Sequence, residues 1–340
     1  MYPGTEGLPP RVALLQLITA SWVSHAVRTM AVLGVADHLA DGPRTVGELA
    51  EATGTDAPTL ARFMRALAAL GLVAHDAAGR VGLTPLGEPL RAAVPGSLRS
   101  YALAIAAPSV ERAWHDLPNA LRTGEPSFPD VHGLGFWDYL AAHPEEGALF
   151  DAAMTGSAEL RSGVLPAAVD LSAIGTLIDV GGGQGRMLAA ALASAPGLRG
   201  VLADRSEVLP GAEAFLDAAG VRDRCDLVAV DFFESVPTGG DAYVLAHIVH
   251  DWPDEQAVAI LRTCHQAMAP GARLWVVEQV IQPGDEYDRA KLLDMLMLVL
   301  FGAQERTADE YRSLLQAAGF GEVVIHPTDT PYSVIETVRH

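Results

Sequence analysis

Cysteine is nearly absent from this chain: only Cys225 and Cys264 occur among its 340 residues. Two cysteines are too few for the disulfide framework of a small secreted protein, and they fit a reducing compartment. Basic residues are scarce as well, since 23 Lys and Arg stand against 42 Asp and Glu, for a formal net charge of −19. A surface that negative repels phosphate, so the composition argues against nucleic acids and anionic membranes as partners.

The chain also lacks a long hydrophobic run. Its most apolar window, residues 12–27, is interrupted by polar side chains and closed by Arg28. A membrane-spanning helix needs about 20 largely apolar residues, and the same window is too polar for the core of an export signal. We therefore expect a cytoplasmic protein without a membrane partner.

The length favours two domains, because 340 residues exceed what one small hydrophobic core holds. Residues 1–165 are predicted to be mainly helical. From about residue 175, short apolar runs alternate with helical stretches, which is typical of an α/β, doubly wound, Rossmann-like sheet with parallel strands. We place the second domain at residues 166–340, and expect the segment 286–304 to add a helix to it.

Residues 45–84 predict a winged helix. Thr45-Val-Gly-Glu48 has the form of a capping box, and apolar residues recur at helical spacing over residues 60–70, before two short strand-like runs. A DNA-binding regulator would present Arg62 and Arg65 to a major groove. A dimerisation and substrate-lid domain would instead bury its helices against a partner. The shortage of basic residues favours dimerisation, because phosphate contacts dominate DNA affinity.

A glycine-rich loop, Asp179-Val-Gly-Gly-Gly-Gln-Gly185, follows a predicted strand and opens a helix. Glycines let the backbone approach a ligand closely, and Asp204, at the end of the next strand, suits the hydroxyls of a ribose. The spacing lacks the third small residue of a dinucleotide fingerprint, and no basic cradle for a pyrophosphate follows. The acid Asp179 suits a cationic ligand, so we favour S-adenosylmethionine over a dinucleotide. A purely structural glycine turn is the alternative.

The third predicted strand ends in Val230-Asp231-Phe232-Phe233. An acid followed by an aromatic residue at the carboxyl edge of a parallel sheet is where an adenine ring would bind. Phe232 fits the hydrophobic core equally well. Its position one strand after Asp204 favours the adenine contact.

A histidine-containing run, His247-Ile-Val-His250-Asp-Trp-Pro-Asp254, follows the fourth predicted strand. A histidine there can take the proton of a phenol, whose pKa is about 10. Glu278, at the end of the fifth strand, and Glu305 are the two acids that can orient such an imidazole. The alternatives are a structural histidine, and a Glu305 that pairs with Arg306 or caps the following helix.

Taken together, these motifs resemble those of the S-adenosylmethionine-dependent O-methyltransferases that act on plant phenolics and on bacterial polyketides and other natural products. The resemblance covers nearly the whole chain. It implies a winged-helix dimerisation domain, a Rossmann-like catalytic domain and a homodimer. The implied reaction is methyl transfer, without a metal, to a phenolic hydroxyl of a small aromatic natural product such as an aromatic polyketide in antibiotic biosynthesis.

The resemblance also assigns roles to individual residues. His250 would be the general base, flanked by Glu278 and Glu305. The candidate cofactor residues are Asp179, Gly181, Gly183, Asp204, Asp231, Phe232 and His247. The candidate substrate residues are Trp137, Met154, Asp251 and Asp294.

Two positions depart from the family pattern. Ala246 stands where plant members commonly carry a lysine, and Ala303 replaces the second glycine of a frequent run before the acid at 305. The family also contains members that have lost methyl transfer and perform other chemistry on similar substrates. The presence of His250, Glu278 and Glu305 favours methyl transfer.

Overall fold

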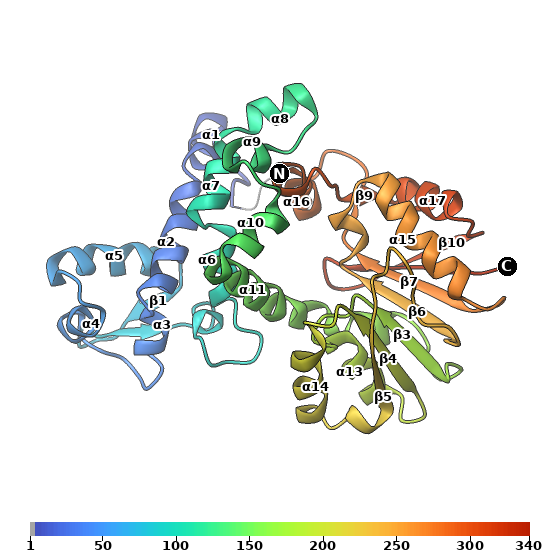
Figure 1. Ribbon diagram of the computed structural model, residues 1–340. Helices are drawn as coiled ribbons and strands as arrows, with labels where there is room; N and C mark the ends of the chain where they lie inside the picture. The colour runs from blue at the N-terminus through green and yellow to red at the C-terminus, as the bar shows by residue number, and fades with distance from the viewer. Residues whose placement is uncertain (1–3) are drawn as a thin grey trace. The chain divides into compact units, whose positions relative to one another are not determined.

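The computed structural model describes residues 4–340, which form two compact units. The first unit contains the described residues up to Arg112 together with Trp137–Ser157, and the second contains Ala113–Phe136 and Ala158–His340. Figure 1 colours the chain along its length. The division at residues 165 and 166 stays a prediction.

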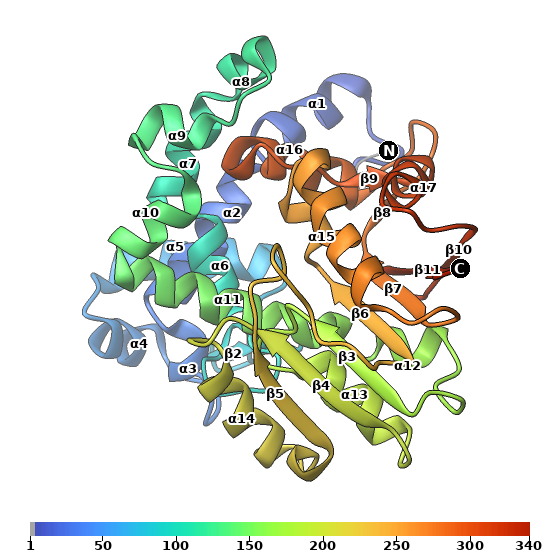
Figure 2. The same cartoon turned by 45° about the vertical axis from the view of Figure 1, so that its right-hand side comes forward.

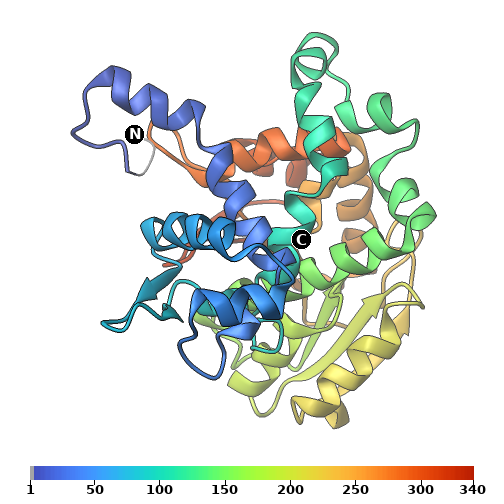
Figure 3. The same ribbon diagram turned by 90° about the vertical axis from the view of Figure 1, so that its left-hand side faces the viewer.

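The first unit is helical except for one hairpin (Figure 3). Helices α4 (Val46–Thr53) and α5 (Ala57–Ala69) precede strands β1 (Val73–His75) and β2 (Val81–Leu83), which is the order of a winged helix. The other elements of this unit are α1 (Pro10–Ile18), α2 (Ser21–Val32), α3 (Val35–His38), the 3-10 helix η1 (Glu88–Leu90) and α6 (Arg99–Ile105).

The predicted capping box begins α4. The Glu48 backbone N–H donates to Thr45 Oγ1 at 3.2 Å, and the Thr45 N–H donates to Glu48 Oε2 at 2.7 Å. On α5, Leu60, Met64 and Leu67 are buried in the core of this unit. Because these three residues share one face of a helix, the sequence periodicity identified the inward side correctly.

Three helices contribute residues to both units: α7 (Pro108–His115), α10 (Phe136–Ala142) and α11 (Pro144–Ser162). Helices α8 (Leu117–Thr123), α9 (Ser127–His132) and α12 (Val164–Ala168) belong to the second unit. None of the helices within residues 4–340 is both long enough and apolar enough to cross a membrane.

A seven-stranded sheet forms the centre of the second unit, in the order β10-β11-β7-β6-β3-β4-β5 (Figure 2). Its strands are β3 (Thr176–Val180), β4 (Arg199–Asp204), β5 (Cys225–Ala229), β6 (Ala242–Ala246), β7 (Arg273–Glu278), β10 (Val323–Pro327) and β11 (Ser333–Val338). The five strands from β7 to β5 are parallel, as the alternating pattern predicted. The expectation of parallel pairing is wrong for β10, which pairs antiparallel with β11.

Helices cover both faces of this sheet, and each face has its own hydrophobic core. On one face lie α12, α13 (Arg186–Ser194) and α14 (Leu209–Ala218), and on the other lie α15 (Asp254–Ala267) and α17 (Ala308–Ala317). The remaining elements are α16 (Arg289–Phe301), the 3-10 helices η2 (Arg222–Arg224) and η3 (Val249–Asp251), and the short parallel pair β8 (Val280–Ile281) and β9 (Arg306–Thr307). Burial on both faces explains why the parallel strands are continuous apolar runs in the sequence.

Candidate active site

The strand order of the large sheet locates a candidate site. The order reverses between β3 and β6, which lie side by side at the centre of the sheet. Ligands of open α/β sheets bind outside the carboxyl ends of the strands at such a reversal. The glycine-rich loop after β3 and the run containing His250 after β6 both lie at this edge.

Asp179 is the penultimate residue of strand β3, directly before the glycines of the loop, and is fully buried. Neither of its carboxylate oxygens has a hydrogen-bond partner in the described part of the chain. Burial raises its pKa to about 7, and the negative charge of Asp204 adds to the shift. A cationic ligand nearby would relieve this desolvated carboxyl group, so the site fits a ligand with positive charge.

Two glycines let the loop come close to its neighbours. At Gly181 the backbone φ is +69°, and an added Cβ would lie 2.7 Å from Ile248 Cδ1. Gly183 has a φ of +58° with open space around the position of a Cβ. The loop therefore presents bare backbone toward an open region, which is what a ligand cradle requires.

Asp204, at the end of β4, holds the loop in place. Its Oδ2 accepts a hydrogen bond from the Gly183 N–H at 2.8 Å, and its Oδ1 accepts one from the Arg205 N–H at 2.7 Å. Burial raises its pKa. The carboxylate is therefore placed beside the loop, while its predicted contact with a ribose stays a prediction.

Phe232 also lies against the glycine loop. Its Cε1 is 3.6 Å from the position that a Cβ on Gly181 would occupy, and its ring centroid is 6.2 Å from that of Trp252. Asp231 is exposed and accepts a hydrogen bond from the Phe233 N–H at 2.9 Å. The structure thus brings Phe232 to the edge where an adenine contact was predicted, and that contact stays a prediction.

His250 is buried and held by carboxylates on both ring nitrogens. Nδ1 lies 2.7 Å from Oε1 of Glu305, which is itself buried, and Nε2 lies 3.3 Å from Oδ1 of Asp251. The sequence alternatives for Glu305 are therefore wrong: it contacts the histidine, and Thr307 with Glu310 forms the capping box of α17.

The side chain of Glu278 binds the backbone of the segment that carries His250. Oε1 accepts hydrogen bonds from the N–H groups of Ile248, Val249 and His250 at 3.1, 2.9 and 3.3 Å. This carboxylate therefore caps η3 and fixes the position of His250 through the main chain, and it influences the imidazole by its charge.

These acids decide where a proton resides. Burial by itself lowers the pKa of His250, but the charges of Glu278, Asp251 and Glu305 outweigh it and raise the pKa to about 10. Burial raises the pKa of Glu278 to about 7. At neutral pH the cluster therefore holds a proton on His250, and the imidazole has a proton affinity close to that of a phenolate.

Two residues that position this cluster were not recognised in the sequence as doing so. Arg306 is fully buried and donates hydrogen bonds to the carbonyl oxygens of Val249 and Trp252 and to Asp254 Oδ1, at 2.8 to 3.0 Å. Asp294 Oδ1, on α16, accepts a hydrogen bond from the Glu305 N–H at 3.0 Å. Asp294 thereby fixes the backbone of Glu305, and its predicted contact with substrate stays a prediction.

His247 has an unusual backbone conformation. Its φ of +62° is the only positive value for a non-glycine residue between residues 4 and 340. Its ring centroid lies 3.8 Å from that of His250, and burial together with the charge of His250 lowers its pKa well below the ordinary value. Its Nε2 is buried without a hydrogen-bond partner among the described residues. A backbone held in this region is strained, which is common at functional sites.

His247, His250 and Glu278 also form a group of side chains that could hold a metal ion. Ligand atoms of His247, His250 and Glu278 all lie within 4.8 Å of one another. Glu278 Oε1 already accepts three backbone hydrogen bonds, and Nδ1 of His250 is engaged by Glu305. Two of the three potential metal ligands, Glu278 and His250, therefore already use these atoms to position His250.

Two predicted substrate residues belong to the other unit. Trp137 is 45% exposed, and its ring packs edge-on against Phe150 with the centroids 5.7 Å apart. Met154 is half-buried on α11. Both assignments stay predictions, because each unit is described by itself.

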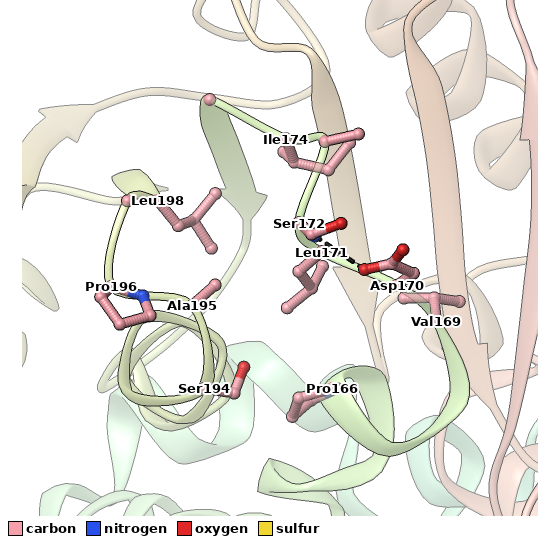
Figure 4. A pocket seen from close by; sticks show the side chains of 13 residues that line it. Pro166, Val169, Asp170, Leu171, Ser172, Ile174, Ser194, Ala195, Pro196 and Leu198 are labelled. Carbon is pink, nitrogen blue, oxygen red and sulfur yellow. Dashed lines mark hydrogen bonds between the residues drawn. The ribbon is translucent and has the colours of Figure 1, made fainter.

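A cavity of about 710 Å³ opens elsewhere in the second unit (Figure 4). It lies between the segment before β3 and the segment that joins α13 to β4, at the edge of the sheet opposite the glycine loop. Two of its polar side chains are satisfied locally: Asp170 accepts from the Ser172 N–H, and Ser194 donates to the Ala191 carbonyl. The cavity therefore offers no chemistry comparable to that around His250.

Comparison with known proteins identifies the family. Residues 114–321 match the O-methyltransferase domain, and residues 15–91 match the O-methyltransferase dimerisation domain. The chain belongs to the O-methyltransferase family. It is an S-adenosylmethionine-dependent O-methyltransferase, and its dimerisation domain supports a homodimer.

Named relatives share most of its length. A phenazine O-methyltransferase from Lysobacter antibioticus is 41% identical over 97% of this chain and 96% of its own. The crystal structure of LaPhzM superposes with a TM-score of 0.91 and 40% identity, covering 98% of this chain and all of the other.

Two further relatives bear on the chemistry. The crystal structure of NcsB1, from neocarzinostatin biosynthesis, contains S-adenosylmethionine and 2-hydroxy-5-methyl naphthoic acid. It has a TM-score of 0.76 and 35% identity, covering 94% of this chain and 96% of its own. An aclacinomycin 10-hydroxylase from Streptomyces purpurascens is 36% identical over 86% of this chain and 80% of its own. The family therefore spans methyl transfer and hydroxylation.

Proposed function

We propose that this O-methyltransferase methylates a phenolic hydroxyl of a small aromatic natural product, with His250 as the general base and without a metal. The buried pair of His250 and Glu305, 2.7 Å apart at the same sheet edge as the glycine loop, carries the proposal. S-Adenosylmethionine supplies an electrophilic methyl group when bound. Relatives named as O-methyltransferases of aromatic natural products support the substrate class.

In this proposal the neutral form of His250, protonated only at Nδ1, accepts the phenolic proton at Nε2. Asp251 Oδ1, now 3.3 Å from Nε2, gives way to the phenol oxygen, and Glu305 keeps Nδ1 protonated and the ring oriented. Since the pKa of His250 is raised to about 10, only the fraction of the enzyme in which Nε2 is deprotonated acts as the base at neutral pH, and in that fraction the proton passes between groups of similar affinity, because the pKa of a phenol is also about 10. Burial of the imidazole excludes water from this step.

The proposed cofactor residues lie at or next to the same edge of the sheet. Asp179, Gly181, Gly183, Asp204, Asp231, Phe232 and His247 would contact the cofactor. Trp137, Met154, Asp251 and Asp294 would contact the acceptor. Asp179 matches the positive charge of the cofactor with a buried carboxyl group that lacks a partner among residues 4–340.

The test is a methyl-transfer assay with methyl-labelled S-adenosylmethionine and a panel of phenols that includes 2-hydroxy-5-methyl naphthoic acid. We expect labelled methyl ethers from the wild type and a loss of about 10²- to 10⁴-fold in rate in His250→Ala, since general-base help is worth that much. Binding of S-adenosylhomocysteine, followed by calorimetry, should be retained in the variant. Undiminished transfer by His250→Ala would remove the histidine from the mechanism, and a hydroxylated product without a methyl group would point to the other chemistry of the family.

A further inference from the structure

Arg161 occupies a place beside the glycine loop that neither the motifs nor the proposed site includes. It lies in the last turn of α11, within the part of that helix that belongs to the second unit. Two residues earlier, Glu159 Oε2 accepts a hydrogen bond from Arg186 Nη1 at 2.8 Å. Arg186 is the first residue of α13, directly after the glycine loop, so this contact holds the end of α11 next to the loop.

The guanidinium of Arg161 has unsatisfied hydrogen-bonding capacity within the described part of the chain. Its Nη1 is buried, yet it has no hydrogen-bond partner within residues 4–340, and no carboxylate of these residues forms an ion pair with Arg161. Arg306 shows the ordinary situation, because its buried nitrogens donate to carbonyl oxygens and to Asp254. Leaving a buried cationic N–H unpaired is costly, and such an atom indicates a missing acceptor.

The charge of Arg161 nevertheless reaches the site. Its positive charge acts to lower the pKa of Asp179, of His247 and of Asp251, although burial outweighs this effect for the two acids, whose pKa values are raised. These three groups lie at the carboxyl ends of β3 and β6, on the two sides of the strand-order reversal. The guanidinium therefore lies at the same edge as the candidate cofactor residues, without being neutralised by any of the acids there.

We propose that Arg161 binds the α-carboxylate at the methionine end of S-adenosylmethionine. The inference rests on the proposed function for its cofactor and adds a residue to that site. A sulfonium and an ammonium are matched by the acids at this edge, whereas the carboxylate requires a cation. The planar guanidinium offers a pair of N–H donors that fits a carboxylate.

The carboxylate that pairs with Arg161 could also come from an aromatic acceptor that carries one. The contact between α11 and the start of α13 favours the cofactor, because it holds this turn next to the glycine loop. The experiment distinguishes the two sources by using separate ligands.

The test combines one amino-acid substitution with one change of ligand, and the affinity of each of the four protein–ligand pairs is measured by calorimetry. Arg161→Gln is compared with the wild type for S-adenosylhomocysteine and for S-adenosyl-3-thiopropylamine, which lacks only the carboxylate. We expect the variant to bind S-adenosylhomocysteine about 10- to 100-fold more weakly, as for loss of a hydrogen bond between charged groups. Its affinity for the amine should stay within about twofold of the wild type, because that ligand has no carboxylate to lose.

Arg199→Gln is the matched control, since it removes the same charge from Arg199 at the start of β4, whose exposed ion pair with Asp226 lies on the surface. It should leave both affinities unchanged. Arg161→Lys, which keeps the charge and loses the paired donors, should give an intermediate loss and replaces Arg161→Gln if that variant does not fold.

Three outcomes overturn the inference alone, and a fourth overturns it together with the proposed cofactor. Equal losses for both ligands would mean that Arg161 only supports the fold. Unchanged affinity for S-adenosylhomocysteine with weaker binding of 2-hydroxy-5-methyl naphthoic acid would assign Arg161 to the acceptor. Unchanged affinity for every ligand would leave Arg161 without a role in binding. Failure of the wild type to bind S-adenosylhomocysteine would instead refute the proposed cofactor, and the inference with it.

Discussion

The proton affinity of His250 depends on the carboxylates that surround it, and Glu305→Gln separates charge from geometry. Glutamine keeps an acceptor oxygen for Nδ1, which lies 2.7 Å from Glu305 Oε1, but it carries no charge. Since Glu305 is one of the acids that raise the pKa of His250 to about 10, its neutralisation must lower that pKa. We expect a downward shift of about 1 to 2 units.

The magnitude follows from the geometry. Charge centres of an imidazolium and a carboxylate in this contact lie about 4 Å apart, which gives about 4 kcal/mol at an effective dielectric constant of about 20. That energy corresponds to about 3 pKa units. The observed shift should be smaller, because Asp251 and Glu278 remain, and Glu278 ionises more readily once Glu305 is neutral.

The assay is an NMR titration of protein labelled with ¹³C at histidine Cε1. The resonance of His250 is assigned by its loss in His250→Ala, and its midpoint is compared in the wild type and in Glu305→Gln. Glu322→Gln is the control, because it removes an exposed acid from the segment before β10. A midpoint in Glu305→Gln that equals the wild-type value, or lies above it, contradicts the electrostatic argument.

Two further predictions concern the glycine loop. Asp204→Ala removes the acceptor of the Gly183 N–H, so we expect at least about tenfold weaker calorimetric binding of S-adenosylhomocysteine; Asp226→Ala, an exposed change on the adjacent β5, should bind as the wild type does. The pKa of Asp179 is raised from 3.8 to about 7, so its stabilising contribution is complete below pH 4 and is lost as the pH rises through 7. Asp179→Asn should therefore unfold at a higher temperature than the ligand-free wild type above pH 7, with the difference shrinking toward pH 4; a difference independent of pH would count against a raised pKa.

The sequence predicted the elements whose signals are local. The capping box at Thr45, the amphipathic face of α5 and the apolar runs of β3 to β7 each depend on residues close together in the chain. Strand β11 was not predicted, and without it the antiparallel partner of β10 was unknown. Its register with β7 joins residues about 60 apart, which no local periodicity encodes.

The candidate site divides in the same way. The glycine loop and the run around His250 are recognisable because their residue types and spacing carry the chemistry. The roles of the acids required the tertiary structure. Glu278 ends β7, and the parallel pairing of Ala246 with Val277 brings its carboxylate under the backbone of η3. Without that pairing, two roles for an acid cannot be distinguished. One acid orients the imidazole directly, and the other caps the turn beneath it.

The sequence by itself determined the order of the elements up to β10, the glycine-rich loop and the histidine, because these follow from nearest neighbours and from motifs. Only the tertiary structure decided which charges lie together. The pairing of β8 with β9 places Glu305 on the imidazole of His250, and the fold leaves Arg161 without an acceptor among residues 4–340. Electrostatic interactions depend on distance in space and on burial, and neither quantity is written in the spacing of residues along a chain.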